Sequence, residues 1–118
     1  MVAEFLRLLL GTVIYRPYVY AFFACFLHDW ADDTCVRILS NLRRAMPPTG
    51  RVLGIDAVLA PAGTPDMNKV SDLVMMVVSP GRERTEDEFR RLYDAAGFRL
   101  TRVIRTPSSL SIVEGAPA

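Results

Sequence analysis

The stretch that decides the fold is Tyr18-Val-Tyr-Ala-Phe-Phe-Ala-Cys-Phe-Leu27, which runs directly into His28-Asp29-Trp30. Its residues are aromatic or apolar and follow neither a helical nor an alternating period. Such a run is typical of a strand buried on both faces, as in a parallel sheet covered by helices. Ligands of open α/β sheets bind beyond the carboxyl ends of the strands, where His28 would lie. The stretch therefore predicts an α/β fold with a candidate site beside His28.

Residues 32–46 follow as a predicted amphipathic helix with an acidic first turn. Its apolar positions recur at helical spacing and are Cys35, Ile38, Leu39, Leu42 and Met46. The Pro-Pro-Thr-Gly run at 47–50 ends the helix. Residues 51–59 then predict a second buried strand, which is nearly continuous in apolar residues until Asp56.

Residues 66–78 predict a helix that is apolar almost all the way round. One face, taken here as the core face, holds Val70, Leu73, Val74 and Val77. A second face holds Ser71, Met75 and Val78. That second face needs a cover, and a partner chain, a further domain or a ligand are the alternatives.

The remaining residues predict a loop, one more helix and a terminal hairpin. After the loop at 79–84, Thr85 and Glu88 have the spacing of a capping box that opens a helix, and Gly97 closes it. Residues 98–104 and 110–113 are two short strands joined by a turn. The element order as a whole predicts an α/β sheet that starts parallel and ends in an antiparallel hairpin.

Composition excludes several classes of protein. From 118 residues, 51% of them hydrophobic, and a net charge of +1, we expect at most one small globular domain, without the charge of a nucleic-acid-binding protein. Cys25 and Cys35 form no disulfide framework, so we expect a reducing, cytoplasmic setting. One histidine and two scattered cysteines do not build a zinc site, and we expect no metal.

The N-terminal part of the chain is apolar enough to raise the question of a membrane segment. Residues 5–27 are the apolar region, but Arg7, Arg16 and Pro17 interrupt it. No unbroken stretch there approaches the ~20 residues that a spanning helix needs. Glu4 also precedes the first arginine, which is atypical of a secretory signal. We expect neither a membrane span nor a signal peptide.

Three polar residues are candidates for chemistry. His28 follows the first strand, Asp56 lies near the end of the second strand at the same predicted edge, and Glu83 could reach that edge from its loop. Carboxylates beside a histidine orient it and make it more basic. Spacing alone favours structural roles over catalytic ones, namely a loop or cap contact for Asp56 and a solvated ion pair with Arg82 or Arg84 for Glu83.

Separated motifs nevertheless occur in an informative order. They are Phe26-Leu-His-Asp-Trp-Ala-Asp-Asp33, Arg37-Ile-Leu-Ser-Asn-Leu-Arg-Arg-Ala-Met-Pro-Pro-Thr-Gly-Arg-Val-Leu53, Asp56-Ala-Val-Leu59, Asp72-Leu-Val-Met-Met76, Gly81-Arg-Glu-Arg-Thr-Glu-Asp-Glu-Phe89 and Ala95-Ala-Gly-Phe98. Together they resemble the second half of the O-methyltransferase family of plant phenylpropanoid and bacterial polyketide-tailoring enzymes. The resemblance covers 18–118 as the C-terminal part of a catalytic domain, whereas residues 1–17 are unassigned.

The resemblance implies part of a Rossmann-like class I methyltransferase sheet and an activity dependent on S-adenosylmethionine. His28 matches the catalytic base, and Asp56 and Glu83 match the carboxylates that flank it. Met75 matches a methionine that lines the acceptor pocket, and Asp29 is assigned to substrate binding. The implied acceptor is a hydroxyl, of phenolic type, on a small molecule.

The sequence also departs from the family's pattern. The 118 residues contain no glycine-rich cofactor loop, and Ala24 stands where the family commonly has a lysine near the adenine. We therefore expect a truncated enzyme that binds the cofactor poorly. One alternative is a non-catalytic remnant that pairs with a second copy through residues 66–78. Another is a related tailoring enzyme with a different reaction, such as hydroxylation.

Overall fold

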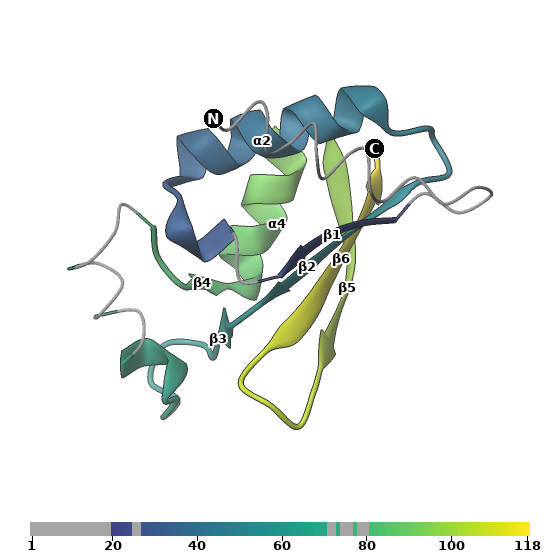
Figure 1. The fold of residues 1–118 in the computed structure, drawn as a ribbon. Helices are drawn as coiled ribbons and strands as arrows, with labels where there is room; N and C mark the ends of the chain where they lie inside the picture. Colours follow the sequence, from purple (N-terminus) through teal and green to yellow (C-terminus); the bar gives the residue numbers. More distant parts are fainter. Residues whose placement is uncertain (1–19, 25–26, 71–72, 74–76, 78–80) are drawn as a thin grey trace.

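A computed structural model describes residues 20–24, 27–70, 73, 77 and 81–118 of the chain. Its centre is a four-stranded sheet in the order β1-β2-β6-β5 (Figure 1). The strands are β1 (Tyr20–Ala24), β2 (Arg51–Asp56), β5 (Phe98–Arg105) and β6 (Ser111–Pro117). The predicted α/β class is thus observed, with a mixed sheet.

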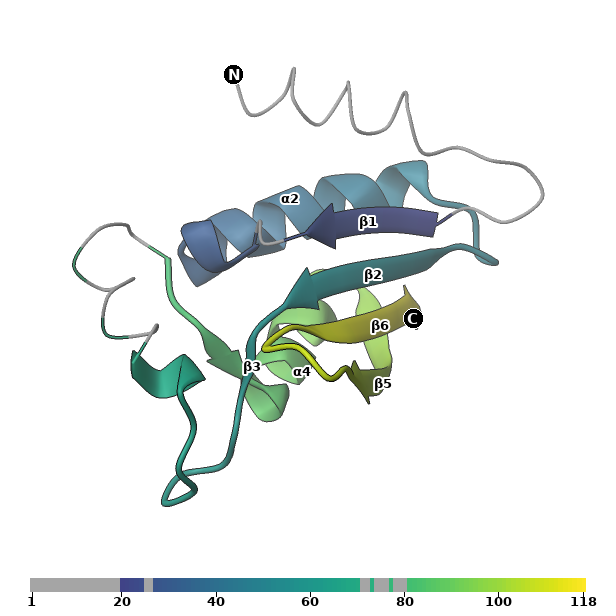
Figure 2. The same ribbon diagram turned by 60° about the horizontal axis from the view of Figure 1, so that its bottom comes forward.

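The strand pairing follows the predicted order. β1 and β2 are parallel, with Tyr20 opposite Arg51 and Ala24 opposite Ile55. β6 lies antiparallel between β2 and β5, so the last two strands form the predicted hairpin. The four strands lie side by side in Figure 2, with the C-terminus at the end of β6.

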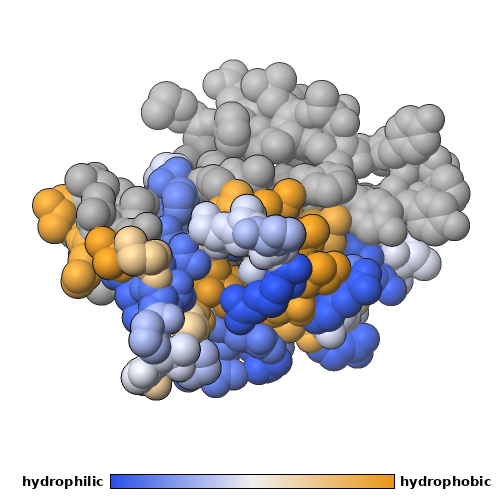
Figure 3. Space-filling model, turned by 90° about the horizontal axis from the view of Figure 1, so that it is seen from below, coloured by the Kyte–Doolittle hydropathy of each residue, from blue (hydrophilic) through white to orange (hydrophobic). Residues whose placement is uncertain are grey.

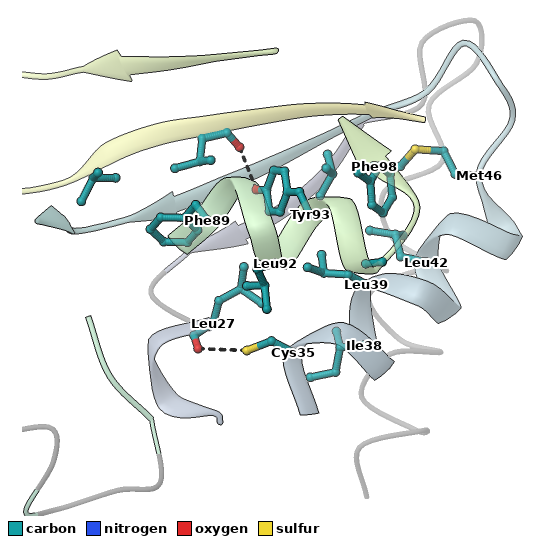
Figure 4. Packing of buried hydrophobic residues seen from close by; sticks show 14 residues of the cluster. Leu27, Cys35, Ile38, Leu39, Leu42, Met46, Phe89, Leu92, Tyr93 and Phe98 are labelled. Atoms are coloured by element: carbon teal, nitrogen blue, oxygen red, sulfur yellow. Dashed lines mark hydrogen bonds between the residues drawn. The ribbon is translucent and has the colours of Figure 1, made fainter. Parts of the chain in front are cut away.

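Helices α2 (Asp32–Ala45) and α4 (Glu86–Ala95) pack on the same face of this sheet and share one core with it (Figure 4). That core contains every apolar position predicted for the first helix, together with residues of α4 and of the strands. Its largest apolar members include Leu27, Ile38, Leu39, Phe89, Tyr93 and Phe98. Burying one such side chain contributes about 1.5–3 kcal/mol to folding.

Tyr93 fastens α4 to the sheet. Its hydroxyl donates to the carbonyl of Val113 at 2.9 Å, and its ring meets that of Phe89 edge to face (Figure 4). Glycine is required beneath it, because a Cβ at Gly115 would lie 2.8 Å from the ring and one at Gly54 2.9 Å from the hydroxyl oxygen. The two glycines therefore allow an aromatic side chain to lie close against β2 and β6.

One prediction about the second strand is wrong, because it is not buried on both faces. Val52, Gly54 and Asp56 are buried beneath the helices, whereas Arg51, Leu53 and Ile55 on the opposite face are partly exposed. Both described helices that pack on the sheet cover the same side. Burial in β2 therefore alternates, although its apolar run is nearly continuous.

The length predicted for that strand is also wrong. It ends at Asp56, and β3 (Val58–Leu59) instead pairs in parallel with β4 (Arg84–Thr85) in a separate two-stranded sheet. The loop predicted at 79–84 therefore ends in a short strand. The first strand is described as β1 at Tyr20–Ala24, and its predicted end at Leu27 is wrong, since Leu27–Asp29 form a 3-10 turn, η1. Cys25 and Phe26 lie outside the described residues.

Helix α4 begins at the predicted cap, where the Thr85 hydroxyl accepts the backbone N–H of Glu88 at 3.3 Å. The carboxylate of Glu88 forms an ion pair with Arg82 at 2.6 Å. That pair connects the start of α4 to the segment that precedes β4.

The segment predicted as a helix at 66–78 is helical at its described positions 68–70, 73 and 77. Its predicted core face is wrong, because Val70, Leu73 and Val77 are 52%, 65% and 85% exposed. Apolar surface appears at that edge of the molecule in Figure 3. At the described positions these side chains are therefore not covered, and Met75 lies outside the described residues. No helix in the described part of the chain is both long and apolar enough to cross a bilayer.

Candidate active site

The side chains of His28, Asp56 and Glu83 meet at the carboxyl end of β2. Asp56 is the last residue of β2, His28 lies in the middle of η1, and Glu83 immediately precedes β4. One polar atom from each lies within 4.8 Å of the others. The parallel pairing of β3 with β4 brings Glu83 to this edge, because β3 follows Asp56 by only one residue.

Glu83 is the hydrogen-bond partner of the imidazole. Its Oε1 lies 3.0 Å from Nδ1 of His28, and its side chain is 5% exposed. The interpretation of Glu83 as a solvated ion pair is therefore wrong. Burial works to lower the pKa of His28, but the hydrogen bond to Glu83 and the charges of Asp56, Glu83 and Asp29 outweigh it, so this pKa lies above 6.5.

Asp56 holds the backbone of the histidine more closely than its ring. One carboxylate oxygen accepts the N–H of His28 at 3.2 Å, the other accepts that of Ala57 at 3.2 Å, and the nearest distance to the imidazole is 3.6 Å. Burial raises the pKa of Asp56 to about 6; the charge of His28 opposes this rise and that of Glu83 adds to it. The carboxylate thus anchors the turn and contributes a negative field.

Asp29 lies at the other ring nitrogen. Its Oδ1 is 3.3 Å from Nε2 of His28, and its side chain is 52% exposed. A neutral imidazole that donates through Nδ1 to Glu83 carries its lone pair on Nε2. The basic nitrogen is therefore the one beside the half-exposed Asp29.

Gly81 lets the segment with Glu83 approach the histidine turn, and sequence reasoning gave it no role. A Cβ at this position would lie 1.7 Å from the carbonyl oxygen of His28 and 2.5 Å from the carbonyl carbon of Asp29. Only glycine allows two backbones to come so close. The signal in the sequence is the glycine of the Gly81-Arg-Glu-Arg84 motif, two residues before the candidate carboxylate.

Solved structures define the class of protein to which this fold and this site belong. The methyltransferase of calicheamicin biosynthesis, in its SAH-bound form, matches with a TM-score of 0.79 and 44% identity over 84% of this chain and 30% of its own. The fold is accordingly part of a class I S-adenosylmethionine methyltransferase fold. Residues 19–99 match the O-methyltransferase domain family, and the chain belongs to that family.

Two curated relatives illustrate the family's range. The phenazine O-methyltransferase of Lysobacter antibioticus is 48% identical over 77% of this chain and 27% of its own length. The xanthohumol 4-O-methyltransferase of Humulus lupulus is 39% identical over 84% of this chain and 29% of its own length. The chain thus spans less than a third of the relatives that it matches.

Proposed function

We propose that residues 18–118 are the acceptor-activating part of an S-adenosylmethionine-dependent O-methyltransferase. The observation that carries this proposal is the arrangement around His28, in which buried Glu83 bonds Nδ1 and buried Asp56 holds the turn. Family membership supports the same reaction. The acceptor class is a small-molecule hydroxyl, and the phenazine and xanthohumol enzymes among the relatives favour an aromatic one.

His28 is proposed as the general base. A phenol with a pKa near ~10 is mostly protonated at neutral pH, so removing its proton makes the oxygen a much stronger nucleophile. Nε2 accepts this proton, and Glu83 and Asp56 stabilise the positive imidazole that results. Asp29, 3.3 Å from Nε2, is proposed to contact the acceptor hydroxyl, and Met75 is proposed for the pocket wall.

S-adenosylmethionine would supply the methyl group, on a positively charged sulfur. The SAH-bound relative supports this cofactor. The imidazole and carboxylates at His28 suit the activation of the methyl acceptor. The 118 residues include no glycine-rich loop that would bind the nucleoside of the cofactor. We therefore assign no cofactor-binding residue within this sequence. We propose no metal, because proton transfer by His28 and alignment of the reactants supply the chemistry.

A chimera tests the proposal. Residues 18–118 would replace the matching segment of the Lysobacter phenazine O-methyltransferase, and methyl transfer from labelled S-adenosylmethionine to phenolic acceptors would be measured. We expect turnover that His28→Gln reduces by about 10²–10⁴-fold, the range for loss of a general base. Arg90→Gln on the outer surface of α4 is the matched control and should retain activity.

The chimera also separates the alternatives. A folded chimera that binds the cofactor but transfers methyl equally well with His28→Gln would contradict the assigned base. Hydroxylated product in place of methylated product would favour the tailoring enzyme with another reaction.

Pairing between two copies of this chain is a second candidate function, and exposed apolar side chains favour it. Met67, Val70, Leu73 and Val77 are the large apolar residues exposed in the described part of the chain, and all lie at 66–78. An apolar patch on one helical segment is typical of an interaction surface. Sedimentation at rising concentration should show association that Leu73→Lys with Val77→Lys weakens, and an unchanged association would contradict pairing through this segment.

A further inference from the structure

Arg84 is a buried cation that belongs to none of the roles described above. Its side chain is 1% exposed, and an ionised group so fully buried requires partners for its donors. Four of these partners are oxygens, at 2.8–3.3 Å. They are the backbone carbonyls of Leu27, Trp30 and Arg82 and the carboxylate of Asp32.

Two of these carbonyls bracket the histidine turn. Arg84 donates to Leu27 at 3.0 Å and to Trp30 at 2.9 Å, so one guanidinium spans the backbone immediately before and after His28-Asp29. The carbonyl of Leu27 also accepts the N–H of Trp30, which closes the 3-10 turn. The arginine therefore holds both ends of the short segment that presents the imidazole.

Asp32 completes the arrangement from the start of α2. Its carboxylate receives two donors of Arg84, at 2.9 and 2.8 Å, and one of Arg82 at 3.0 Å. Burial works to raise the pKa of Asp32, but these hydrogen bonds outweigh it and lower the pKa. The buried positive charge is thus balanced, and three elements, β4, η1 and α2, are joined at one guanidinium.

We infer that Arg84 is a positioning residue for His28, which it holds against Glu83 by clamping the turn on both sides. Glu83 and Arg84 are adjacent in sequence, so the same short segment supplies the carboxylate that meets the ring and the cation that fixes the ring's backbone. Lysine cannot replace Arg84. The planar guanidinium carries five N–H donors and reaches all of these acceptors together, whereas a single ammonium group cannot span them. The inference deepens the function proposed above and rests on it for its catalytic meaning.

The test uses Arg84→Lys in the 118-residue chain, because this change keeps the charge and removes the fork. His28 is the only histidine, so its imidazole signals in an NMR titration are unambiguous. The groups facing it are Asp29 of η1, Asp56 of β2 and Glu83 before β4. We expect the pKa of His28 to fall toward 6.5 and the Nδ1-protonated form of the neutral ring to lose population.

Tyr93→Phe is the matched control for lost stability, since it removes a buried hydrogen bond to Val113 away from the turn. Tyr93→Phe should lower the melting temperature about as much as Arg84→Lys does, and it should leave the imidazole signals of His28 unchanged. Asp32→Asn weakens the anchor of the arginine at a half-exposed position, and it should shift the pKa of His28 in the same direction by a smaller amount.

Unchanged imidazole behaviour in folded Arg84→Lys would overturn the inference, because the arginine would then be structural only. If Arg84→Lys does not fold, Asp32→Asn decides in the same way. The NMR readout requires no methyl transfer, so a chimera without activity would count against the proposed function and leave this result standing.

Discussion

At the scale of single residues, the candidate site is a histidine among three carboxylates with different surroundings. Glu83 is buried and bonded to the ring, Asp56 is buried and bonded to the backbone, and Asp29 is half-exposed. Three negative groups around one imidazole favour its protonated form, whereas burial opposes it. The balance raises the pKa of His28, which suits a base that must hold a proton during the reaction.

The raised pKa of Asp56 gives a prediction about pH and stability. In the folded chain this pKa is about 6, against 3.8 for an unperturbed aspartate, so the neutral carboxyl is favoured by folding. The corresponding stability is fully present below pH 3.8 and is lost as the pH rises through 6. Urea unfolding at pH 4 and at pH 6 should show a loss of stability that is about 2 kcal/mol larger in wild type than in Asp56→Asn.

Asp87→Asn is the control for that experiment, since Asp87 is 81% exposed on α4. It should keep the pH dependence of the wild type. An Asp56→Asn variant that loses as much stability as wild type between pH 4 and 6 would contradict the assigned burial effect. The raised pKa of His28 acts in the same direction at higher pH, because its contribution is present below 6.5 and is lost as the pH rises through the folded pKa.

At the scale of elements, the site depends on how closely the segment before β4 approaches η1. Gly81 permits this approach, and the parallel register of β3 and β4, with Val58 opposite Arg84, carries Glu83 to the histidine. Neither element is stable alone, since β3 and β4 have two residues each. Val58 of β3 belongs to the buried core and so anchors this small sheet.

Gly81→Ala should therefore separate these two elements. The added Cβ would meet the backbone carbonyl of His28 at 1.7 Å, and backbone yields less readily than the end of a flexible side chain. Overpacking of this kind costs about 1–3 kcal/mol of unfolding free energy, measurable by urea titration. The pKa of His28 should fall as well, because its distance from Glu83 increases.

Gly63→Ala provides the comparison for that change. A Cβ at Gly63 meets nothing within 4 Å, although its φ of +84° makes the substitution costly by about 1 kcal/mol or more. We expect lower stability with the pKa of His28 unaltered. Equal pKa values in wild type and Gly81→Ala would show that the close approach does not set the geometry of the site.

At the scale of the whole molecule, the described sheet has helices α2 and α4 on one face and partly exposed apolar residues on the other. The exposed side of the 66–78 segment adds further apolar surface. Small domains bury a limited fraction of their surface, and the described residues leave apolar side chains available for contact. Its stability should accordingly depend on what covers these faces.

We predict that these 118 residues, purified by themselves, bind S-adenosylmethionine weakly. The groups proposed for the acceptor side are present, whereas the sequence offers neither a glycine-rich loop nor a lysine at the Ala24 position. Isothermal titration calorimetry should give no saturable heat at micromolar cofactor, and methyl transfer should stay at background. Tight binding at one site per chain would show that the cofactor site is complete within this sequence.

The sequence by itself predicted the types and approximate positions of the longer elements, and it named the three residues, His28, Asp56 and Glu83, that the structure brings together. Helical spacing marked α2 and α4, apolar runs marked β1 and β2, and the motif around His28 carried the resemblance to O-methyltransferases. These signals are local, because they depend on neighbouring side chains and on backbone preferences along a short stretch. The hydrophobic period of a segment does not indicate which other element covers its apolar face.

Tertiary structure alone decided the contacts between distant segments. Three of these contacts join residues far apart in the chain: the pairing of β3 with β4, the close approach at Gly81 and the hydrogen bonds of Arg84. The end of β2 at Asp56 was likewise decided by tertiary structure. Tertiary structure also decided which apolar faces are covered, and it left Leu73 and Val77 exposed. The physical reason is that burial and hydrogen bonding across such distances depend on how whole elements pack, which no single stretch of sequence encodes.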